Sequence, residues 1–217
     1  MKIDFLYKNG WLFLIIAMLG DIIISLVLAK FYSGYSITKM SISALGNPSS
    51  PVRIPFNIWM IIEGLLFLSA IPAIYKYYSS VSSGLTKTVV LFVAIFAIGA
   101  CIFTGFFSVN ESKDIVTTAS KIHGAGSVIG FMLFLFVPLL MGVLSFKNSE
   151  AFLGVIVIIC FFISMFFFVL FVMSDKPEFE NSVIQNEGLW QRLNLIFMYL
   201  PLIIVSIKRI IQMDVAG

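Results

Sequence analysis

Long apolar runs dominate the hydrophobic pattern of this chain. Six stretches are mostly apolar over about 20 residues, the length that an α-helix needs to cross the hydrocarbon core of a bilayer. They cover residues 11–30, 54–76, 88–108, 122–145, 152–174 and 193–211. Because backbone N–H and C=O groups must be paired inside hydrocarbon, each run predicts a transmembrane helix. The predicted fold class is all-α: one domain over residues 1–217, a bundle of six transmembrane helices.

Two other interpretations of the apolar runs fail. A β-barrel would show short segments in which apolar and polar residues alternate, whereas residues 161–171 are apolar at every position except Ser164. The first run is preceded by lysines, as in a signal peptide, but Asp21 interrupts it and the apolar residues continue to Ala29. That length exceeds the apolar region of a usual signal peptide, so we predict a retained span.

The composition agrees with a membrane protein. Hydrophobic residues make up 60% of the 217 positions and charged residues 12%, whereas a soluble domain carries about 25% charged residues. The net charge of +3 comes without a basic cluster, which argues against a nucleic-acid partner. Cys101 and Cys160 lie inside apolar runs without the spacing of metal ligands, so we expect neither a metal nor a cofactor.

Six spans place both termini on one side of the membrane. We call this side the terminal face, and the side of connections 31–53, 109–121 and 175–192 the long-loop face. Seven Lys and Arg residues fall on each face, so the positive-inside rule gives no decision. Six acidic residues lie on the long-loop face and three on the terminal face, a difference that slightly favours cytoplasmic termini in a cell membrane.

Asp21 and Glu63 are acidic residues inside the predicted spans. Each lies about 15 Å from the nearer span end at 1.5 Å per residue, close to the bilayer centre. A carboxylate there costs several kcal/mol unless it is partnered or protonated, and such residues usually face a bundle interior or a wet cavity. The two acids could share one proton; in the alternative interpretation they are neutral residues that serve only packing.

Polar residues also begin three of the spans at the long-loop face. Asn57 lies near the start of the second span, His123 of the fourth and Arg192 of the sixth. Arg presents a two-pronged donor to phosphate, and helix N-termini add positive potential, so this group predicts a pocket for an anionic headgroup. In the alternative interpretation, interfacial His and Arg side chains only extend to the headgroups. The predicted ligand-binding residues are Ser43, Gly46, Asn57, Glu63, His123 and Arg192.

Glycines in the third and fourth spans fit close helix packing. Gly99 and Gly105 lie in the third span, and Gly126-x-x-x-Gly130 in the fourth is a match to the small-xxx-small pattern. We expect these glycines to serve packing.

Several short segments resemble one known family. They are Ser41-Ile-Ser-Ala-Leu-Gly46, Pro51, Phe56-Asn57, Gly105-x-Phe107, His123 and Gly188-Leu-Trp-Gln-Arg192. This pattern is similar to domain-of-unknown-function family 998, six-span membrane proteins of bacteria and archaea, although Ser108 stands where that pattern has proline. More distantly it resembles the DRAM/Frag/Sfk six-span group, whose members are linked to autophagy, GPI-anchor remodelling and lipid asymmetry. The resemblance implies a six-span fold but no activity.

The sequence therefore predicts a multi-pass membrane protein with a polar, outward-facing pocket that binds a lipid headgroup or a small polar ligand. No recognised catalytic motif is present, and we assign no catalytic residue. One alternative is a small proton- or cation-coupled transporter that uses Asp21 and Glu63. Another is a membrane enzyme that acts on lipid headgroups with His123 as general base. The expected partners are a membrane lipid, a small polar ligand or a proton; the oligomeric state is left open.

Overall fold

The computed structural model describes residues 2–110 and 116–216, with side chains for residues 3–110 and 116–213. All regular structure in these ranges is helical, which confirms the all-α fold class. The helices that cross the bundle are α1 (Lys2–Ala29), α2 (Arg53–Tyr78), α3 (Ser83–Phe96) with η2 (Ala97–Ile102) and α4 (Phe103–Phe106), α5 (Thr118–Phe134) with α6 (Val137–Lys147), α7 (Ala151–Met173) and α8 (Glu187–Ala216). Where consecutive helices are joined, they form six candidate membrane spans.

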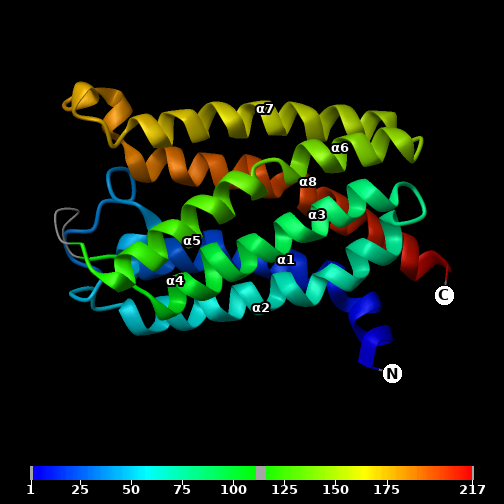
Figure 1. Ribbon diagram of the computed structural model, residues 1–217, viewed down its shortest axis with the longest axis horizontal. Helices are drawn as coiled ribbons and strands as arrows, with labels where there is room; N and C mark the ends of the chain where they lie inside the picture. Colours follow the sequence, from blue (N-terminus) through cyan, green and yellow to red (C-terminus); the bar gives the residue numbers. More distant parts are fainter. Residues whose placement is uncertain (1, 111–115, 217) are drawn as a thin grey trace.

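The helices form one elongated bundle in which neighbours cross at shallow angles (Figure 1). α1 packs on α2 and α8, and α7 packs on α6 and α8. The start of α1, the end of α8 and the short turns after α2 and α6 lie at one end of the bundle, which is the terminal face. The longer connections, including the 3-10 turn η1 (Ile42–Gly46), lie at the other end.

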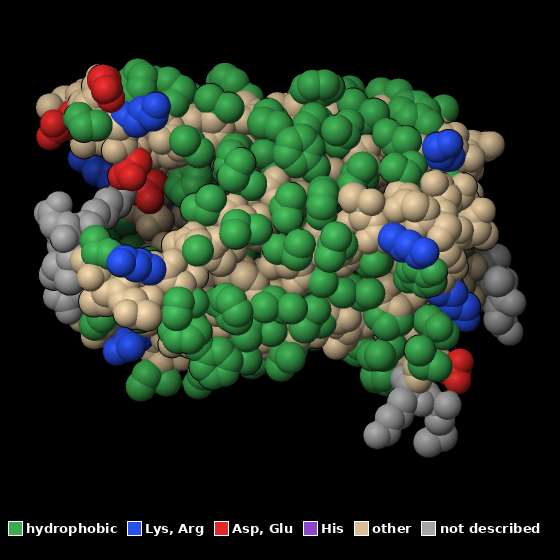
Figure 2. Space-filling model, in the orientation of Figure 1, with side chains coloured by type: hydrophobic (Ala, Val, Ile, Leu, Met, Phe, Trp, Pro, Cys, Tyr) green, Lys and Arg blue, Asp and Glu red, His purple; other side chains and the backbone are tan. Residues whose placement is uncertain are grey.

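The outer surface has the character of a membrane protein. Hydrophobic side chains cover the middle of the bundle, and charged side chains gather at its two ends (Figure 2). On α7, Phe152, Phe162 and Phe166 are each more than half exposed. Contiguous apolar surface of this extent is unfavourable in water but matches hydrocarbon. The chain is a multi-pass membrane protein.

Most helices extend beyond the predicted apolar runs. α1 begins at Lys2, α5 at Thr118 and α8 at Glu187, each several residues before the corresponding run. Hydropathy detects only the part of a helix that lies in hydrocarbon, whereas the helix continues through the interface while its backbone groups stay paired. At the start of α5, the hydroxyl of Thr117 accepts from Ser120 N and that of Ser120 from Thr117 N, which is a capping box.

The fourth span is broken between α5 and α6. Pro138 lies in the first turn of α6 and has no backbone N–H with which to continue the α5 ladder to Phe134. On the two sides of this break the helices have different neighbours: α6 packs on α7, whereas α5 packs on α3 and η2. In Figure 1, α5 accordingly diverges from α7 towards the long-loop face.

Close backbone contact between the third and fourth spans depends on glycine. A Cβ atom added to Gly99 would lie 2.6 Å from the carbonyl oxygen of Gly126, and one added to Gly126 would lie 2.7 Å from that of Gly99. Gly130 lies against Ala100 in the same crossing. Because backbone cannot move aside as a flexible side chain can, these glycines serve packing, as predicted.

We expect Gly99→Ala to lower the free energy of unfolding by about 1–3 kcal/mol, the usual cost of overpacking. Gly124→Ala is the matched control, since a Cβ atom added to this α5 glycine meets nothing within 4 Å. Thermal unfolding in detergent, followed by tryptophan fluorescence, measures both. Equal midpoints for the two variants would contradict the proposed close contact.

Candidate functional site

A cavity of about 470 Å³ lies in the half of the bundle next to the long-loop face. Residues of all six spans line it, together with the segment around η1. Figure 2 shows the molecule hollowed at this end, beside acidic side chains. The polar lining residues are Asp21, Ser41, Ser43, Glu63, Thr104, His123, Ser127, Glu187 and Gln191. The remaining lining is apolar and rich in phenylalanine.

The two intramembrane acids face this cavity. Asp21 on α1 is 5% exposed and Glu63 on α2 is 0% exposed. The Tyr199 hydroxyl on α8 donates to Asp21 Oδ2 over 3.0 Å. Tyr199 and the Cys101 thiol of the π-helical turn η2 are also polar neighbours of Glu63. The sequence placed both acids at mid-depth, and the fold brings them to the same cavity.

The carboxyl of Glu63 lacks a well-formed hydrogen bond within the described part of the chain. The Cys101 thiol and the Tyr199 hydroxyl lie close enough to interact with it as weak hydrogen-bond donors. Neither carboxyl oxygen, however, has a partner that meets hydrogen-bond distance and angle, and both are fully buried. Buried polar groups without a partner are rare in native proteins and call for an explanation such as a bound molecule. A ligand that donates a hydrogen bond to the carboxyl of Glu63 would therefore gain the most favourable polar contact in the cavity.

An aromatic cluster closes the floor of the cavity. Phe67, Phe96, Phe134 and Tyr199 are each at most 2% exposed. Their rings contact one another, with centroids 4.3 Å apart for Phe96 and Phe134 and 5.3 Å for Phe67 and Phe96. Phe67 lies one turn beyond Glu63 towards the terminal face. The polar region thus ends at the acids and does not continue across the bundle.

The start of α8 holds the loop that forms the roof of the cavity. Ile42 N donates to the Gln191 side chain over 2.7 Å, which fixes η1 to α8. Arg192 Nη1 donates to the carbonyl oxygen of Ile37 over 2.7 Å, and its Nη2 donates to the Tyr35 hydroxyl over 2.8 Å. The roof is therefore attached to α8 by side-chain hydrogen bonds that span some 150 residues of sequence.

Tyr35 and Gly188 complete this attachment. The Tyr35 hydroxyl donates to the carbonyl oxygen of Ser41 over 2.8 Å. Burial raises the pKa of Tyr35 above its ordinary value of 10.0, so the phenol keeps the proton that it donates. A side chain at Gly188 would collide with the carbonyl oxygens of Met40 and Ile37. Glycine here lets the loop lie directly on α8.

His123 lies at the start of α5, 5% exposed, and lines the cavity. Its Nδ1 lies 2.8 Å from the carbonyl oxygen of Phe107. A carbonyl oxygen only accepts, so Nδ1 is the protonated nitrogen and Nε2 of the neutral ring carries the lone pair. This contact fixes both the tautomer and the ring orientation at the cavity wall.

The structure separates the predicted pocket residues into two groups. Ser43, Glu63 and His123 line the cavity. Gly46, Asn57 and Arg192 stand behind the lining: the amide nitrogen of Asn57 donates to the hydroxyl of Ser108, and Gly46 lies against Asn57 and Phe56. Arg192 directs its terminal nitrogens at the roof loop instead of into the cavity.

Comparison with protein families gives one match. Residues 15–208 match the model of the family described as "Protein of unknown function (DUF998)". The chain belongs to this family. The matched region of this DUF998 protein contains every lining residue of the cavity. Comparison with curated proteins and with solved structures returned no match, and the more distant resemblance to the DRAM/Frag/Sfk group stays a prediction.

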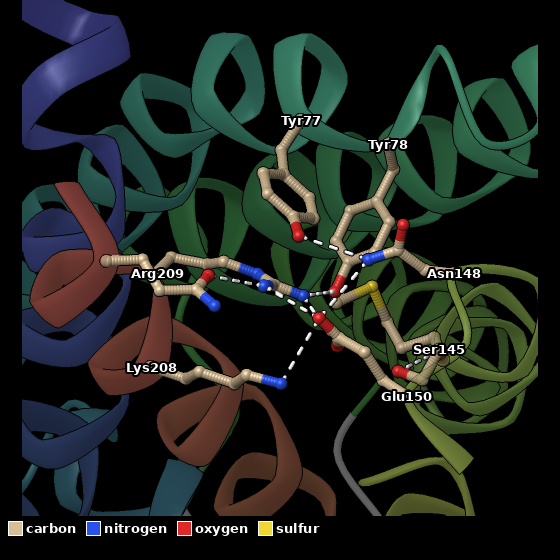
Figure 3. A network of polar contacts seen from close by, with 9 residues as sticks. Tyr77, Tyr78, Ser145, Asn148, Glu150, Lys208 and Arg209 are labelled. Carbon is tan, nitrogen blue, oxygen red and sulfur yellow. Dashed lines mark hydrogen bonds and ion pairs between the residues drawn. The ribbon is translucent and has the colours of Figure 1, made fainter. Parts of the chain in front are cut away.

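The DUF998 chain has a second polar cluster, at the terminal face (Figure 3). Glu150 accepts from both terminal nitrogens of Arg209, over 3.0 and 2.8 Å, and pairs with Lys208 at 3.1 Å. The Arg209 guanidinium is 1% exposed and lies over the Tyr77 ring, 3.8 Å from its centroid. Asn148 bridges Glu150 and the Tyr77 hydroxyl. The cluster joins the ends of α2 and α8 to the turn between α6 and α7.

Sequence reasoning missed this cluster. It treated Arg209 and Glu150 only as charges at the interface, because no spacing within the sequence relates residues 59 positions apart. The available signal was that an arginine near the end of an apolar span requires a partner when its helix is buried. The donors of Arg209 are largely used inside the cluster, so this cluster holds helices together and leaves little capacity for a ligand.

The cluster makes stability depend on pH. Burial acts to raise the pKa of Glu150, but the hydrogen bonds and charges of Arg209 and Lys208 outweigh it and hold that pKa below the ordinary 4.5. A carboxyl with a depressed folded-state pKa contributes stability that is present above its unfolded pKa and is lost as the pH falls through the folded value. Because Glu150 is partly exposed and solvent screens the pair, Glu150→Gln should cost about 1 kcal/mol at pH 7 and progressively less below about pH 4.5.

Unfolding midpoints of the wild type and of Glu150→Gln across this pH range measure the effect. Glu178→Gln, an exposed acid on the long-loop face, is the matched control and should leave the midpoint unchanged. A wild-type advantage over Glu150→Gln that stays constant as the pH falls would contradict the ion-pair account.

Proposed function

We propose that this DUF998 membrane protein binds the polar end of a membrane amphiphile in the cavity, with the apolar chain of the amphiphile lying between α5 and α7. The observation that carries the proposal is Glu63, a fully buried carboxyl that faces a cavity of about 470 Å³ and whose oxygens have no described partner of good hydrogen-bond geometry. A buried polar group left unsatisfied costs about 1–3 kcal/mol, and more when it is charged. A ligand donor at this position would remove that cost.

The walls of the cavity support entry from the bilayer. On the α5 side, Val128 and Met132 line the cavity and are 57% and 50% exposed. On the α7 side, Val172 lines it and is 49% exposed. Both helices belong to candidate membrane spans, so we take these half-exposed apolar residues as the side of the cavity that faces the bilayer. An amphiphile can enter here without leaving the membrane, whereas a small polar ligand would have to cross apolar surface.

The closed floor favours binding over transport. The polar lining ends at Asp21 and Glu63, and the aromatic cluster of Phe67, Phe96, Phe134 and Tyr199 fills the bundle beyond them. A proton or cation path through the acids would need polar groups on both sides. Transport therefore requires a second conformation, while binding is possible in the observed one.

A membrane enzyme remains the second candidate, on one observation. The contact of His123 Nδ1 with Phe107 O leaves the Nε2 lone pair as the base, which is the arrangement that general-base chemistry uses.

The proposal places this protein in the cell membrane with both termini cytoplasmic, so that the cavity lies in the outer half of the bilayer. The slight excess of acidic residues on the long-loop face supports this orientation.

Photolabelling tests the binding site. The protein, in nanodiscs of phosphatidylcholine, is irradiated with a hexadecanol that carries a diazirine on its chain, and labelled peptides are identified by mass spectrometry. We expect saturable labelling of the 128–132 segment of α5 and the 168–172 segment of α7. An excess of unlabelled hexadecanol should suppress it. Labelling that only rises linearly with probe concentration would overturn the proposal.

Gly124→Trp should reduce this labelling to the linear background. Gly124 lines the cavity, and a side chain added there enters open space, so the indole fills the site without a backbone collision. Gly84→Trp is the matched control: an added side chain also meets nothing there, but Gly84 lies at the terminal face. Equal saturable labelling of the two variants would show that the probe binds elsewhere.

A further inference from the structure

The described lining of the cavity contains acidic side chains but neither Lys nor Arg. Asp21 and Glu63 lie together at its floor. His123, the titratable nitrogen base of the lining, already uses its Nδ1 proton for Phe107. A phosphate or carboxylate at the floor would meet the two acidic side chains, and none of the lining residues is a lysine or arginine that could pair with it. The electrostatics of the cavity thus select against the anionic headgroup that the sequence suggested.

The nearest described arginine does not reverse this selection. Arg192 acts on Asp21 through its charge, but its terminal nitrogens donate to the carbonyl oxygens of Ile37, Met40 and Gly188 and to the Tyr35 hydroxyl. Releasing them for a ligand would detach the roof loop from α8. Arg192 is thus committed to the structure around the site.

The apolar lining suits a cation as well as a chain. Phe56, Phe96 and Phe131 belong to the lining and come from α2, α3 and α5, the helices around the acids. The face of an aromatic ring attracts a cation electrostatically, most strongly where water is excluded. Aromatic walls around a carboxyl are a common arrangement for binding alkylammonium groups.

Building on the proposed function, we infer that the polar end of the bound amphiphile is an ammonium group, held by Glu63 with Asp21 beside it. A second observation supports this assignment besides the acidic floor: Glu63 is 0% exposed, lines the cavity, and neither of its carboxyl oxygens has a described partner of good hydrogen-bond geometry. An ammonium supplies the donors that these oxygens lack and pairs with their charge. The same chemistry is offered by a free lipophilic amine and by an ethanolamine headgroup.

Competition against the photoreactive hexadecanol tests the inference. The competitors share one chain length and differ in the polar end: dodecyltrimethylammonium, dodecylamine, dodecanol and dodecyl sulfate. We expect dodecylamine, whose ammonium carries N–H donors, to compete at concentrations about tenfold or more below dodecanol, the size of effect that a charge-assisted hydrogen bond gives. Dodecyltrimethylammonium pairs by charge and with the aromatic rings but donates no hydrogen bond, so it should fall between dodecylamine and dodecanol. Dodecyl sulfate should be weaker than dodecanol. Lysophosphatidylethanolamine, added as a further competitor, separates the two sources: it competes as well as dodecylamine only if the site also accepts a phospholipid headgroup.

Glu63→Gln should remove the preference for cations, so that dodecylamine and dodecanol compete equally. Glu178→Gln, which removes an exposed acid outside the cavity lining, should keep the wild-type order. If Glu63→Gln does not fold, the order in which the competitors suppress labelling of the wild-type protein tests the ammonium assignment. Saturable labelling with dodecanol or dodecyl sulfate as the best competitor would overturn the ammonium assignment while leaving the amphiphile site intact. The absence of saturable labelling would overturn the amphiphile site itself.

Discussion

The structure depends on how a bundle in hydrocarbon accommodates its few polar side chains. Burying a carboxyl or guanidinium without a partner is costly where water is absent. At the terminal face Glu150 and Arg209 pair with each other, and Lys208 and Asn148 also contact Glu150. These contacts offset the cost of burying the two groups. At the long-loop face the terminal nitrogens of Arg192 donate to loop carbonyls and to Tyr35. Glu63 instead faces a cavity, and neither of its carboxyl oxygens has a described partner of good hydrogen-bond geometry. This contrast separates the structural clusters from the site.

The shape of the cavity follows from two backbone features. Pro138 breaks the fourth span, so that α6 packs mainly on α7 while α5 packs on α3 and η2. Gly99 and Gly126 allow α5 to approach η2 closely. The π-helical turn η2 lies beside Glu63, and such turns are frequently found at functional sites. The proposed function places the entrance for the amphiphile on the side of α5 opposite this tight contact.

The sequence predicted the fold class, the six spans and the acids at mid-depth, because each follows from the cost of placing polar groups in hydrocarbon. It also predicted that Gly99 and Gly126 serve packing. It could not predict which face of each helix the interfacial residues present. Arg192 and His123 occupy equivalent positions at span ends, yet one holds the roof loop and the other lines the cavity. That difference depends on the path of residues 35–42, which local patterns do not encode.

The most direct test of the central claim is an experimental density map of the protein in nanodiscs loaded with dodecylamine. The account predicts elongated density that enters between α5 and α7 and ends beside the carboxyl of Glu63, with Arg192 still bonded to the roof loop. A map in which α5 and α7 close against each other, with Glu63 bonded to protein groups alone, would contradict it.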